Sequence, residues 1–369
     1  MKKMRIIVSG GGTGGHIYPA MALIKRLKER DLIEDVLYVG TEKGLESKIV
    51  KNAGIDFKTI EVQGFRRKLS LDNVKTVQLF LSSIRKSKKI VKEFKPDIVI
   101  GTGGYVCGAV VYAAHALHIP TVIHEQNSIA GVTNKFLAHF VDKVAIAFTE
   151  AADQFSEKKK IVFTGNPRAQ EVVNIKPNDR LKEFNLAADK DTVMIFGGSR
   201  GAKPINQAVI ETLDRFEKTD YQVLFVTGRV HYDNVIKSID SKYLNSANIS
   251  VLPYIDNMPE ILPDIKLIVG RSGATSIAEI TALGIPAIFV PSPYVTHDHQ
   301  TKNAMSVSKV GAAKLIPEAE LTSDKLFQEV NDIMSDAAVQ QEMSDNSKKI
   351  GVPDAADRLI KVLTGLVNK

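Results

Sequence analysis

Two copies of one local pattern, a short apolar strand followed by a glycine-rich loop and a helix, constrain this chain more than any other feature. The first copy runs from the Ile-Ile-Val of residues 6–8 into residues 10–15, and the second from the Val-Met-Ile-Phe of residues 193–196 into residues 197–201. A second pair also repeats, because residues 101–124 and 270–290 both join a glycine turn, a small-residue helix, a Leu-x-Ile-Pro segment and an apolar strand. This duplication predicts two similar domains of parallel sheet covered by helices.

Short β-branched runs alternate with helical stretches, such as residues 18–30 and 205–216, along most of the chain. Strands are expected at residues 5–9, 36–39, 97–100, 121–124, 144–147, 161–164, 192–196, 223–227, 249–252, 267–269, 286–290 and 313–316. We therefore predict an α/β chain of two Rossmann-like, doubly wound domains facing across a cleft. The expected boundaries are an N-terminal domain at 1–170, a polar connector at 171–190, a C-terminal domain at 191–350, and a final helix at 351–369 that packs back on the N-terminal domain.

Charge and cysteine content narrow the class of protein only partly. The 49 Lys plus Arg exceed the 42 Asp plus Glu by a net charge of +7, which fits nucleic acid, a phosphorylated ligand or an anionic lipid surface. Nucleic acid is the least favoured of these partners, because the basic residues are dispersed and the chain has no Trp.

The single cysteine, Cys107, excludes an intramolecular disulfide and lies among small apolar residues, as a buried thiol would. Residues 98–123 carry no charge, but their glycines and Pro120 indicate buried core rather than a membrane-spanning helix.

The first glycine loop matches G-x-G-x-x-G at Gly10, Gly12 and Gly15. This match alone leaves a dinucleotide cofactor open, although the acid expected after the second strand, Glu42, comes late. The more general meaning is that glycines let backbone N–H groups approach an anionic group at a helix N-terminus. His16 follows directly, and beside such a loop it is a candidate general base as well as a candidate packing histidine.

A second candidate phosphate site lies at residues 271–279, where Arg-Ser-Gly-Ala-Thr precedes an apolar helix. Backbone N–H groups and the hydroxyls of Ser272 and Thr275 would meet at the positive end of that helix, as a diphosphate requires. Glu279 lies in the same helix among apolar neighbours, and its carboxylate could accept both hydroxyls of a ribose.

Polar loops follow two further strands. Residues 124–127 (His-Glu-Gln-Asn) and residues 291–303 cluster hydrogen-bonding side chains where strands end, and Gln300 suits a sugar hydroxyl. Adjacent residues such as 297–299 (His-Asp-His) rarely converge on one ion, and the Asp-Lys-Asp of residues 189–191 lies in the expected connector. We therefore expect no bound metal and no cofactor.

These motifs together resemble the MurG family, the UDP-N-acetylglucosamine–N-acetylmuramyl-(pentapeptide) pyrophosphoryl-undecaprenol N-acetylglucosamine transferases of peptidoglycan synthesis. The resemblance spans residues 10 to about 353. It rests on residues 11–16 (GGTGGH), 103–106 (GGYV), 124–127 with 129–131 (HEQN, IAG), 165–168 (GNPR), 197–199 (GGS), 271–274 (RSGA) and Gln300. It implies a GT-B type fold and inverting transfer of N-acetylglucosamine from UDP to a lipid-linked muramyl-pentapeptide.

The resemblance also implies roles for individual residues. The UDP-N-acetylglucosamine donor would be bound by Thr13, Gly14, Gly15, Asn127, Arg168, Ser199, Ile255, Gly273, Ala274, Thr275, Glu279 and Gln300. The acceptor would be bound by Thr13, His16, Tyr105 and Glu125, with His16 or Glu125 as the catalytic base. Some family members carry two consecutive glutamines where this chain has Gln300 and Thr301, so fewer sugar contacts are expected there.

A lipid acceptor requires a membrane-facing surface. Apolar residues fringed by cations describe docking onto anionic lipid, and they occur at Arg66, Arg67, Lys68, Leu69, Leu71, Val74 and Leu79. Val77, Phe80 and Ile84 of the same helix are expected in the core. The predicted location is the cytoplasmic face of the bacterial cell membrane, as a peripheral protein, with other cell-wall synthesis proteins as a further class of partner.

Three alternatives remain at this point: a dinucleotide-dependent oxidoreductase, a non-hydrolysing UDP-N-acetylglucosamine epimerase of the same fold, and a non-catalytic scaffold. The oxidoreductase leaves the second glycine loop and residues 271–279 unexplained, and the epimerase needs no lipid-facing patch.

Overall fold

The computed structural model describes residues 3–63 and 71–368, with the side chains of residues 71–75 and 77 also outside the description. The chain forms two compact units. Unit 1 comprises Met1–Arg168 and Asp354–Lys369, and unit 2 comprises Ala169–Pro353.

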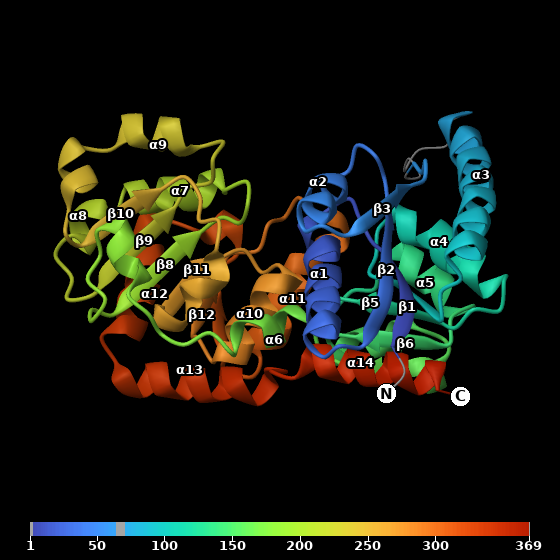
Figure 1. The fold of residues 1–369 in the computed structure, drawn as a ribbon. Helices are drawn as coiled ribbons and strands as arrows, with labels where there is room; N and C mark the ends of the chain where they lie inside the picture. The colour runs from blue at the N-terminus through green and yellow to red at the C-terminus, as the bar shows by residue number, and fades with distance from the viewer. Residues whose placement is uncertain (1–2, 64–70, 369) are drawn as a thin grey trace. The chain divides into compact units, whose positions relative to one another are not determined.

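Unit 1 is built on a seven-stranded parallel sheet of order β3-β2-β1-β4-β5-β6-β7 (Figure 1). Its strands are β1 (Met4–Ser9), β2 (Ile33–Gly40), β3 (Asp56–Thr59), β4 (Ile98–Gly101), β5 (Thr121–Glu125), β6 (Lys143–Ile146) and β7 (Ile161–Phe163). Its helices are α1 (Gly14–Glu29), α2 (Leu45–Asn52), α3 (Leu71–Phe94), α4 (Tyr105–His115), α5 (Val132–Ala138) and α14 (Ala355–Val367), with 3₁₀ helices η1 (Thr149–Gln154) and η2 (Lys158–Lys160). The strand order changes direction between β1 and β4, which is where such sheets bind ligands.

Alternate residues of β1 supply the cores on the two faces of this sheet. Ile6 and Val8 pack in one buried cluster with Leu359 of α14, whereas Ile7 packs in another with Val110 of α4. A strand buried on both faces is continuously apolar, as residues 6–8 are. Because β1 is held in both cores, the glycine loop at its carboxyl end begins from a fixed position.

The last helix, α14, belongs to unit 1. Leu359 and Leu363 are fully buried in the cluster that also contains α1 residues. Asp357 accepts hydrogen bonds from Arg26 Nε at 2.9 Å and Nη2 at 2.8 Å, and from Arg30 Nη1 at 3.0 Å. Because partly exposed ion pairs contribute only about 0–1 kcal/mol, the buried leucines, at roughly 1.5–3 kcal/mol each, hold the helix.

Unit 2 carries a six-stranded parallel sheet of order β10-β9-β8-β11-β12-β13. Its strands are β8 (Thr192–Phe196), β9 (Gln222–Val226), β10 (Ile249–Leu252), β11 (Leu267–Gly270), β12 (Ala287–Phe289) and β13 (Ala313–Leu315). Its α-helices are α6 (Arg168–Val172, whose first residue is the last of unit 1's main segment), α7 (Lys203–Ile210), α8 (Leu213–Phe216), α9 (Tyr232–Ser238), α10 (Ala274–Leu283), α11 (His299–Ser308), α12 (Ser323–Met334) and α13 (Ala337–Ile350). Short 3₁₀ helices are η3 (Arg180–Phe184), η4 (Ser241–Asn245), η5 (Met258–Glu260), η6 (Leu262–Asp264), η7 (Thr296–Asp298) and η8 (Glu318–Glu320).

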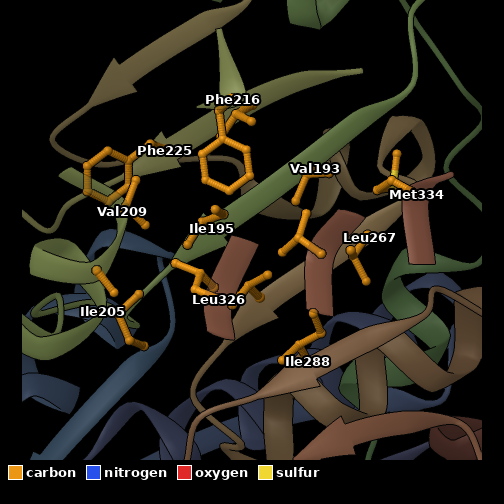
Figure 2. Packing of buried hydrophobic residues seen from close by; sticks show 14 of the residues in the cluster. Val193, Ile195, Ile205, Val209, Phe216, Phe225, Leu267, Ile288, Leu326 and Met334 are labelled. Carbon is orange, nitrogen blue, oxygen red and sulfur yellow. The ribbon is translucent and has the colours of Figure 1, made fainter. Parts of the chain in front are cut away.

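The core of unit 2 lies between its sheet and helices from the beginning and the end of the unit's sequence, α7 and α12. Val193 and Ile195 of β8 pack in one cluster with Ile205 and Val209 of α7 and with Leu326 of α12 (Figure 2). The β11–α10–β12 unit occupies the same place beside β8 that β4–α4–β5 occupies beside β1. The sequence repeat is therefore a repeat of position in the sheet.

Residues 171–190, expected as a connector, pack on unit 2. Leu181 and Leu186 are buried, and the Asn178 backbone N–H donates to Asp264 Oδ1 at 3.1 Å. The main chain passes between the units at residues 168–169 and 353–354. The polar composition of this segment reflects its exposed side, while a few apolar side chains anchor it.

Candidate active site

The glycine loop after β1 interlocks with the loop after β4. Gly11 N–H donates to the Gly103 carbonyl at 3.2 Å, and Tyr38 Oη donates to the Gly10 carbonyl at 2.8 Å. Gly104 has φ +84°, and a Cβ there would lie 2.4 Å from the Gly11 oxygen. Only glycine lets the two loops approach this closely.

His16 lies in the first turn of α1, half-buried beside these loops. Its Nδ1 lies 2.8 Å from the Gly11 carbonyl oxygen, which can only accept, so Nδ1 carries the proton. Thr13 Oγ1 is a more distant neighbour at 3.5 Å. When the ring is neutral, this tautomer leaves the lone pair on Nε2. This is the arrangement that a general base requires.

Glu125, the other candidate base, is buried at the end of β5 and satisfied within its own loop. Oε1 accepts from Asn127 N–H at 3.0 Å, and Oε2 accepts from Gly131 N–H at 2.9 Å and from Asn134 Nδ2 at 2.8 Å. A carboxylate with these contacts fixes the loop that carries Asn127. The geometry therefore favours His16 over Glu125 as the proton acceptor.

His124 and Gln126, on either side of Glu125, make hydrogen bonds within the protein. His124 is fully buried, with Nε2 donating to the Gly165 carbonyl at 2.8 Å and Nδ1 accepting from Gln126 Nε2 at 3.0 Å. Burial lowers the pKa of His124, so the ring remains neutral. These contacts tie the end of β5 to residues 165–168, which end with Arg168.

Three predicted ligand residues of unit 1 are exposed or half-buried. Tyr105, the first residue of α4, is 56% exposed, so its phenol is open to a ligand. The guanidinium carbon of Arg168 lies 5.5 Å from the ring centroid of Tyr18, a cation–π contact. Asn127 is half-buried on the loop that Glu125 fixes. Gly14 and Gly15 begin α1, so the predicted ligand residues of the glycine loop, Tyr105, Glu125 and Asn127 follow the ends of β1, β4 and β5, while Arg168 follows β7 and contacts Tyr18 of α1.

In unit 2, the loop after β8 holds Ser199, whose side chain is exposed. Gly201 has φ +75°, and a Cβ there would meet the Thr227 carbonyl oxygen at 2.1 Å, so this loop is also closely packed. Ile255 is buried beyond β10.

The loop between β11 and α10 makes the other phosphate-like site. Gly273 is the N-cap of α10, and the Thr275 hydroxyl is buried without a hydrogen-bond partner among the described residues. The Ser272 hydroxyl, expected to face a phosphate, instead donates to the Gln300 carbonyl at 2.8 Å. Glu279 is buried in the second turn, 7% exposed. The helix start thus offers backbone N–H groups and one unsatisfied hydroxyl.

Arg271 has a supporting place in this loop. Its guanidinium pairs with Glu318, both side chains being nearly buried, and Nη1 donates to the Val290 carbonyl at 2.9 Å. Arg271 therefore braces the start of α10 against β12 and η8.

Gln300 connects the same loop to the segment after β12. Its Oε1 accepts from Ser292 N–H at 2.8 Å, which fixes the amide so that Nε2 remains as the donor for a ligand. The Thr301 hydroxyl donates to Asp298 Oδ1 at 2.6 Å, so it has an internal role at the start of α11.

Two further features of the described residues concern metal-binding groups and membrane-spanning helices. No group of three or more His, Cys, Asp or Glu in residues 3–63 and 71–368 could hold a metal ion. Over the same part of the chain, every helix is too short or too polar to cross a bilayer. Of the predicted membrane residues, Arg66, Arg67, Lys68 and Leu69 lie outside the described residues, as do the side chains of Leu71 and Val74, while Leu79 is half-buried on α3.

Some contributors to these loops were missed in the sequence. Glu46 and Glu318 each fix a predicted loop from an element distant in sequence, and Asn134 fixes the loop after β5 from the next helix, α5.

Comparison with known proteins agrees with this arrangement. The glycosyltransferase family 28 N-terminal domain matches residues 6–146, and the family 28 C-terminal domain matches residues 192–359. The fold and the two glycine-loop sites therefore define a two-domain glycosyltransferase.

Relatives specify the family. The chain is 60% identical over 365 residues to the UDP-N-acetylglucosamine–N-acetylmuramyl-(pentapeptide) pyrophosphoryl-undecaprenol N-acetylglucosamine transferase of Latilactobacillus sakei subsp. sakei (strain 23K), covering 98% of this chain and 100% of the relative. The crystal structure of Acinetobacter baumannii MurG is 29% identical, with a TM-score of 0.78 and coverage of 98% and 99%. The chain belongs to the MurG family, which confirms the resemblance.

The same comparison bears on the epimerase alternative. UDP-GlcNAc 2-epimerase from Neisseria meningitidis, solved bound to UDP-GlcNAc, is only 15% identical, with a TM-score of 0.66 and coverage of 98% and 100%. A likeness at that identity is a likeness of fold alone.

Proposed function

We propose that the chain transfers N-acetylglucosamine from UDP-N-acetylglucosamine to the 4-hydroxyl of the muramyl sugar of undecaprenyl-diphospho-muramoyl-pentapeptide, with inversion. This is the step from lipid I to lipid II in peptidoglycan synthesis. The observation that carries the proposal is the 60% identity, over nearly the whole chain, to a relative named for this reaction.

The donor is assigned mainly to unit 2. The diphosphate of UDP would accept hydrogen bonds from the N–H groups at residues 273–275 and from the unsatisfied Thr275 hydroxyl. Glu279 would accept from the ribose hydroxyls, and the Ile255 backbone would recognise uracil. Ser199 and Gln300 complete the unit-2 contacts, Gln300 through the Nε2 donor that its bond to Ser292 leaves available.

Unit 1 would supply the remaining contacts. Thr13, Gly14 and Gly15 would approach the phosphates of the bound substrates, Asn127 the N-acetylglucosamine, and Arg168 the leaving diphosphate. Tyr105, exposed at the start of α4, would contact the acceptor.

His16 is the proposed base. As the acceptor O4 forms its bond to C1 of N-acetylglucosamine, the O4 proton passes to Nε2, and the bond from C1 to the diphosphate oxygen breaks with its electron pair leaving on UDP. The hydrogen bond from Nδ1–H supports this assignment because, in the neutral ring, it makes Nε2 the nitrogen that accepts a proton.

We also propose that transfer needs no bound metal. Helix N-terminal amides and Arg168 could together stabilise the charge that develops on the leaving diphosphate, a task that metal ions perform in other transferases.

A peripheral place at the cytoplasmic face of the membrane follows from the lipid acceptor. On α3, Leu81 is 55% exposed, whereas Phe80 and Ile84 pack against the core as expected. A surface pocket on the same helix is lined by Arg85, Lys88, Lys89, Lys92 and Glu93. Apolar and cationic side chains together suit an anionic lipid surface. Cosedimentation with vesicles of anionic phospholipid should fall when Arg85, Lys88 and Lys89 become Gln, and unchanged binding would refute this surface.

The direct test of the reaction is transfer of radiolabelled N-acetylglucosamine from UDP to a polyprenyl-diphosphate muramyl-pentapeptide. We expect label in the lipid product with UDP-N-acetylglucosamine and little with other UDP-sugars. Conversion of UDP-N-acetylglucosamine to its 2-epimer, without label in lipid, would support the epimerase alternative instead.

A further inference from the structure

A carboxylate lies buried beneath the first glycine loop, at Glu46 in the first turn of α2. Its side chain is fully buried. Oε1 accepts from the Thr41 backbone N–H at 2.9 Å and from Thr41 Oγ1 at 2.6 Å, while Oε2 accepts from Gly12 N–H at 3.2 Å. A buried carboxylate requires hydrogen-bond donors, and the three donors here, two backbone N–H groups and one hydroxyl, are neutral.

The surrounding backbone is shaped to this side chain. A Cβ at Gly11 would lie 2.5 Å from Glu46 Oε1, one at Gly44 would lie 2.2 Å from the same atom, and one at Gly40 would lie 2.7 Å from its Cγ. Three glycines therefore leave room for one acidic side chain. The sequence expectation of an acid near this loop centred on Glu42, but Glu42 is exposed and Glu46 is the residue that reaches the loop.

One peptide unit joins Glu46 to His16. The Gly12 N–H, which donates to Glu46, and the Gly11 carbonyl, which accepts from His16 Nδ1 at 2.8 Å, are the two ends of the same planar peptide. A negative acceptor at the N–H end polarises the peptide and strengthens the carbonyl as an acceptor. It also opposes rotation of this peptide, which glycine on both sides would otherwise allow.

We propose that Glu46 is a positioning residue for His16, acting through the Gly11–Gly12 peptide. The carboxylate holds the carbonyl toward Nδ1, and the carbonyl holds the imidazole in the Nδ1–H tautomer with its lone pair on Nε2. A carboxylate bonded directly to the distal nitrogen of a catalytic histidine has the same effect in other enzymes. This inference rests on the proposed role of His16 as the base.

Glu46→Gln tests the inference with little change of shape. A Gln side chain has one acceptor oxygen, so its NH₂ must face either the Thr41 N–H or the Gly12 N–H, and one donor loses its partner. We expect the Gly11–Gly12 peptide to rotate part of the time, and the turnover number to fall by about 10- to 100-fold, the size of effect that small misplacement produces. The KM for UDP-N-acetylglucosamine should change by less than about threefold, because most of the assigned donor contacts lie in unit 2, which the substitution does not touch.

The second readout is the tautomer itself. In ¹⁵N-labelled protein at alkaline pH, the His16 signals, assigned by their loss in His16→Ala, should show a protonated Nδ1 and an unprotonated Nε2. In Glu46→Gln they should move toward the Nε2–H tautomer that free histidine prefers. Thr41→Val, which removes only the hydroxyl donor to Glu46, should shift both readouts in the same direction by a smaller amount, and it serves if Glu46→Gln does not fold.

Asp142→Asn is the matched control. Asp142 Oδ2 also accepts from a threonine backbone N–H and hydroxyl, those of Thr121, but it lies at the opposite end of the sheet strands. It should change neither tautomer nor turnover. An unchanged His16 tautomer in both Glu46→Gln and Thr41→Val overturns the inference, whatever happens to the rate. If His16→Ala keeps full turnover, the base assignment fails instead, and the tautomer result still judges the link from Glu46 to the ring.

Discussion

The interlocked glycine loops of unit 1 predict a severe effect of one added methyl group at Gly104. This residue has φ +84° and ψ 166°, a region that glycine alone populates, so alanine there stores roughly 1–3 kcal/mol of backbone strain. The new Cβ would lie 2.4 Å from the Gly11 oxygen, closer than the 3.0 Å below which real Cβ atoms essentially never approach. The colliding atom is backbone, so the loop must move, which adds about 1–3 kcal/mol.

Gly54→Ala is the control, because Gly54 has φ +65° with open space around the Cβ position. It should cost only about 1–2 kcal/mol of left-handed strain. Urea unfolding followed by circular dichroism should therefore give Gly104→Ala a loss of free energy of unfolding about 2 kcal/mol larger than the control. Turnover should fall at least about tenfold in Gly104→Ala alone, because the displaced carbonyl is the one that orients His16. Equal stability of the two variants would refute the interlocking of the loops.

Further predictions follow from single side chains. His16→Ala should lower the turnover number by about 10²- to 10⁴-fold with little change in the KM for UDP-N-acetylglucosamine; equal losses in both would count against a base. Thr275→Val should raise that KM about tenfold, as loss of one hydrogen bond to a charged phosphate predicts, whereas Thr281→Val, whose hydroxyl donates to Ile277, should not. Burial raises the pKa of the Cys107 thiol from 9.0 to about 12, so iodoacetamide at pH 9 should label it only in urea. Because the folded pKa is the higher one, the stability from protonated Cys107 is complete below pH 9 and declines as pH rises toward 12, which urea titrations can measure. Transfer should persist in EDTA, and a rate restored only by added divalent cation would contradict metal independence.

Much of the fold was predictable because parallel strands buried on both faces are recognisably apolar. Each expected strand is present within a few residues, and residues 192–196 and 249–252 are placed as expected. The missed strand, β3 (Asp56–Thr59), lies at the sheet edge, where half-buried Phe57 and Thr59 alternate with exposed Asp56 and Lys58. Such a strand has too little apolar character to stand out.

The positions of the site loops were predictable from the sequence, whereas the hydrogen-bond partners of the site side chains were not. The glycines beside His16 and the helix start at Gly273 follow from local sequence, since their conformations are local. The hydrogen-bond partners of Glu125 and Ser272 do not follow from local sequence. Asn134 approaches Glu125, and the Gln300 carbonyl approaches Ser272, only when the chain folds. The His16 tautomer likewise depends on a hydrogen bond to a backbone carbonyl, which side-chain identity cannot reveal.

The most direct measurement is a crystal structure of the protein with bound UDP. We predict that diphosphate oxygens will lie within hydrogen-bonding distance of the backbone nitrogens of Gly273, Ala274 and Thr275 and of the Thr275 hydroxyl, with the ribose at Glu279. UDP bound at another place, with residues 273–275 free of phosphate, would contradict this prediction.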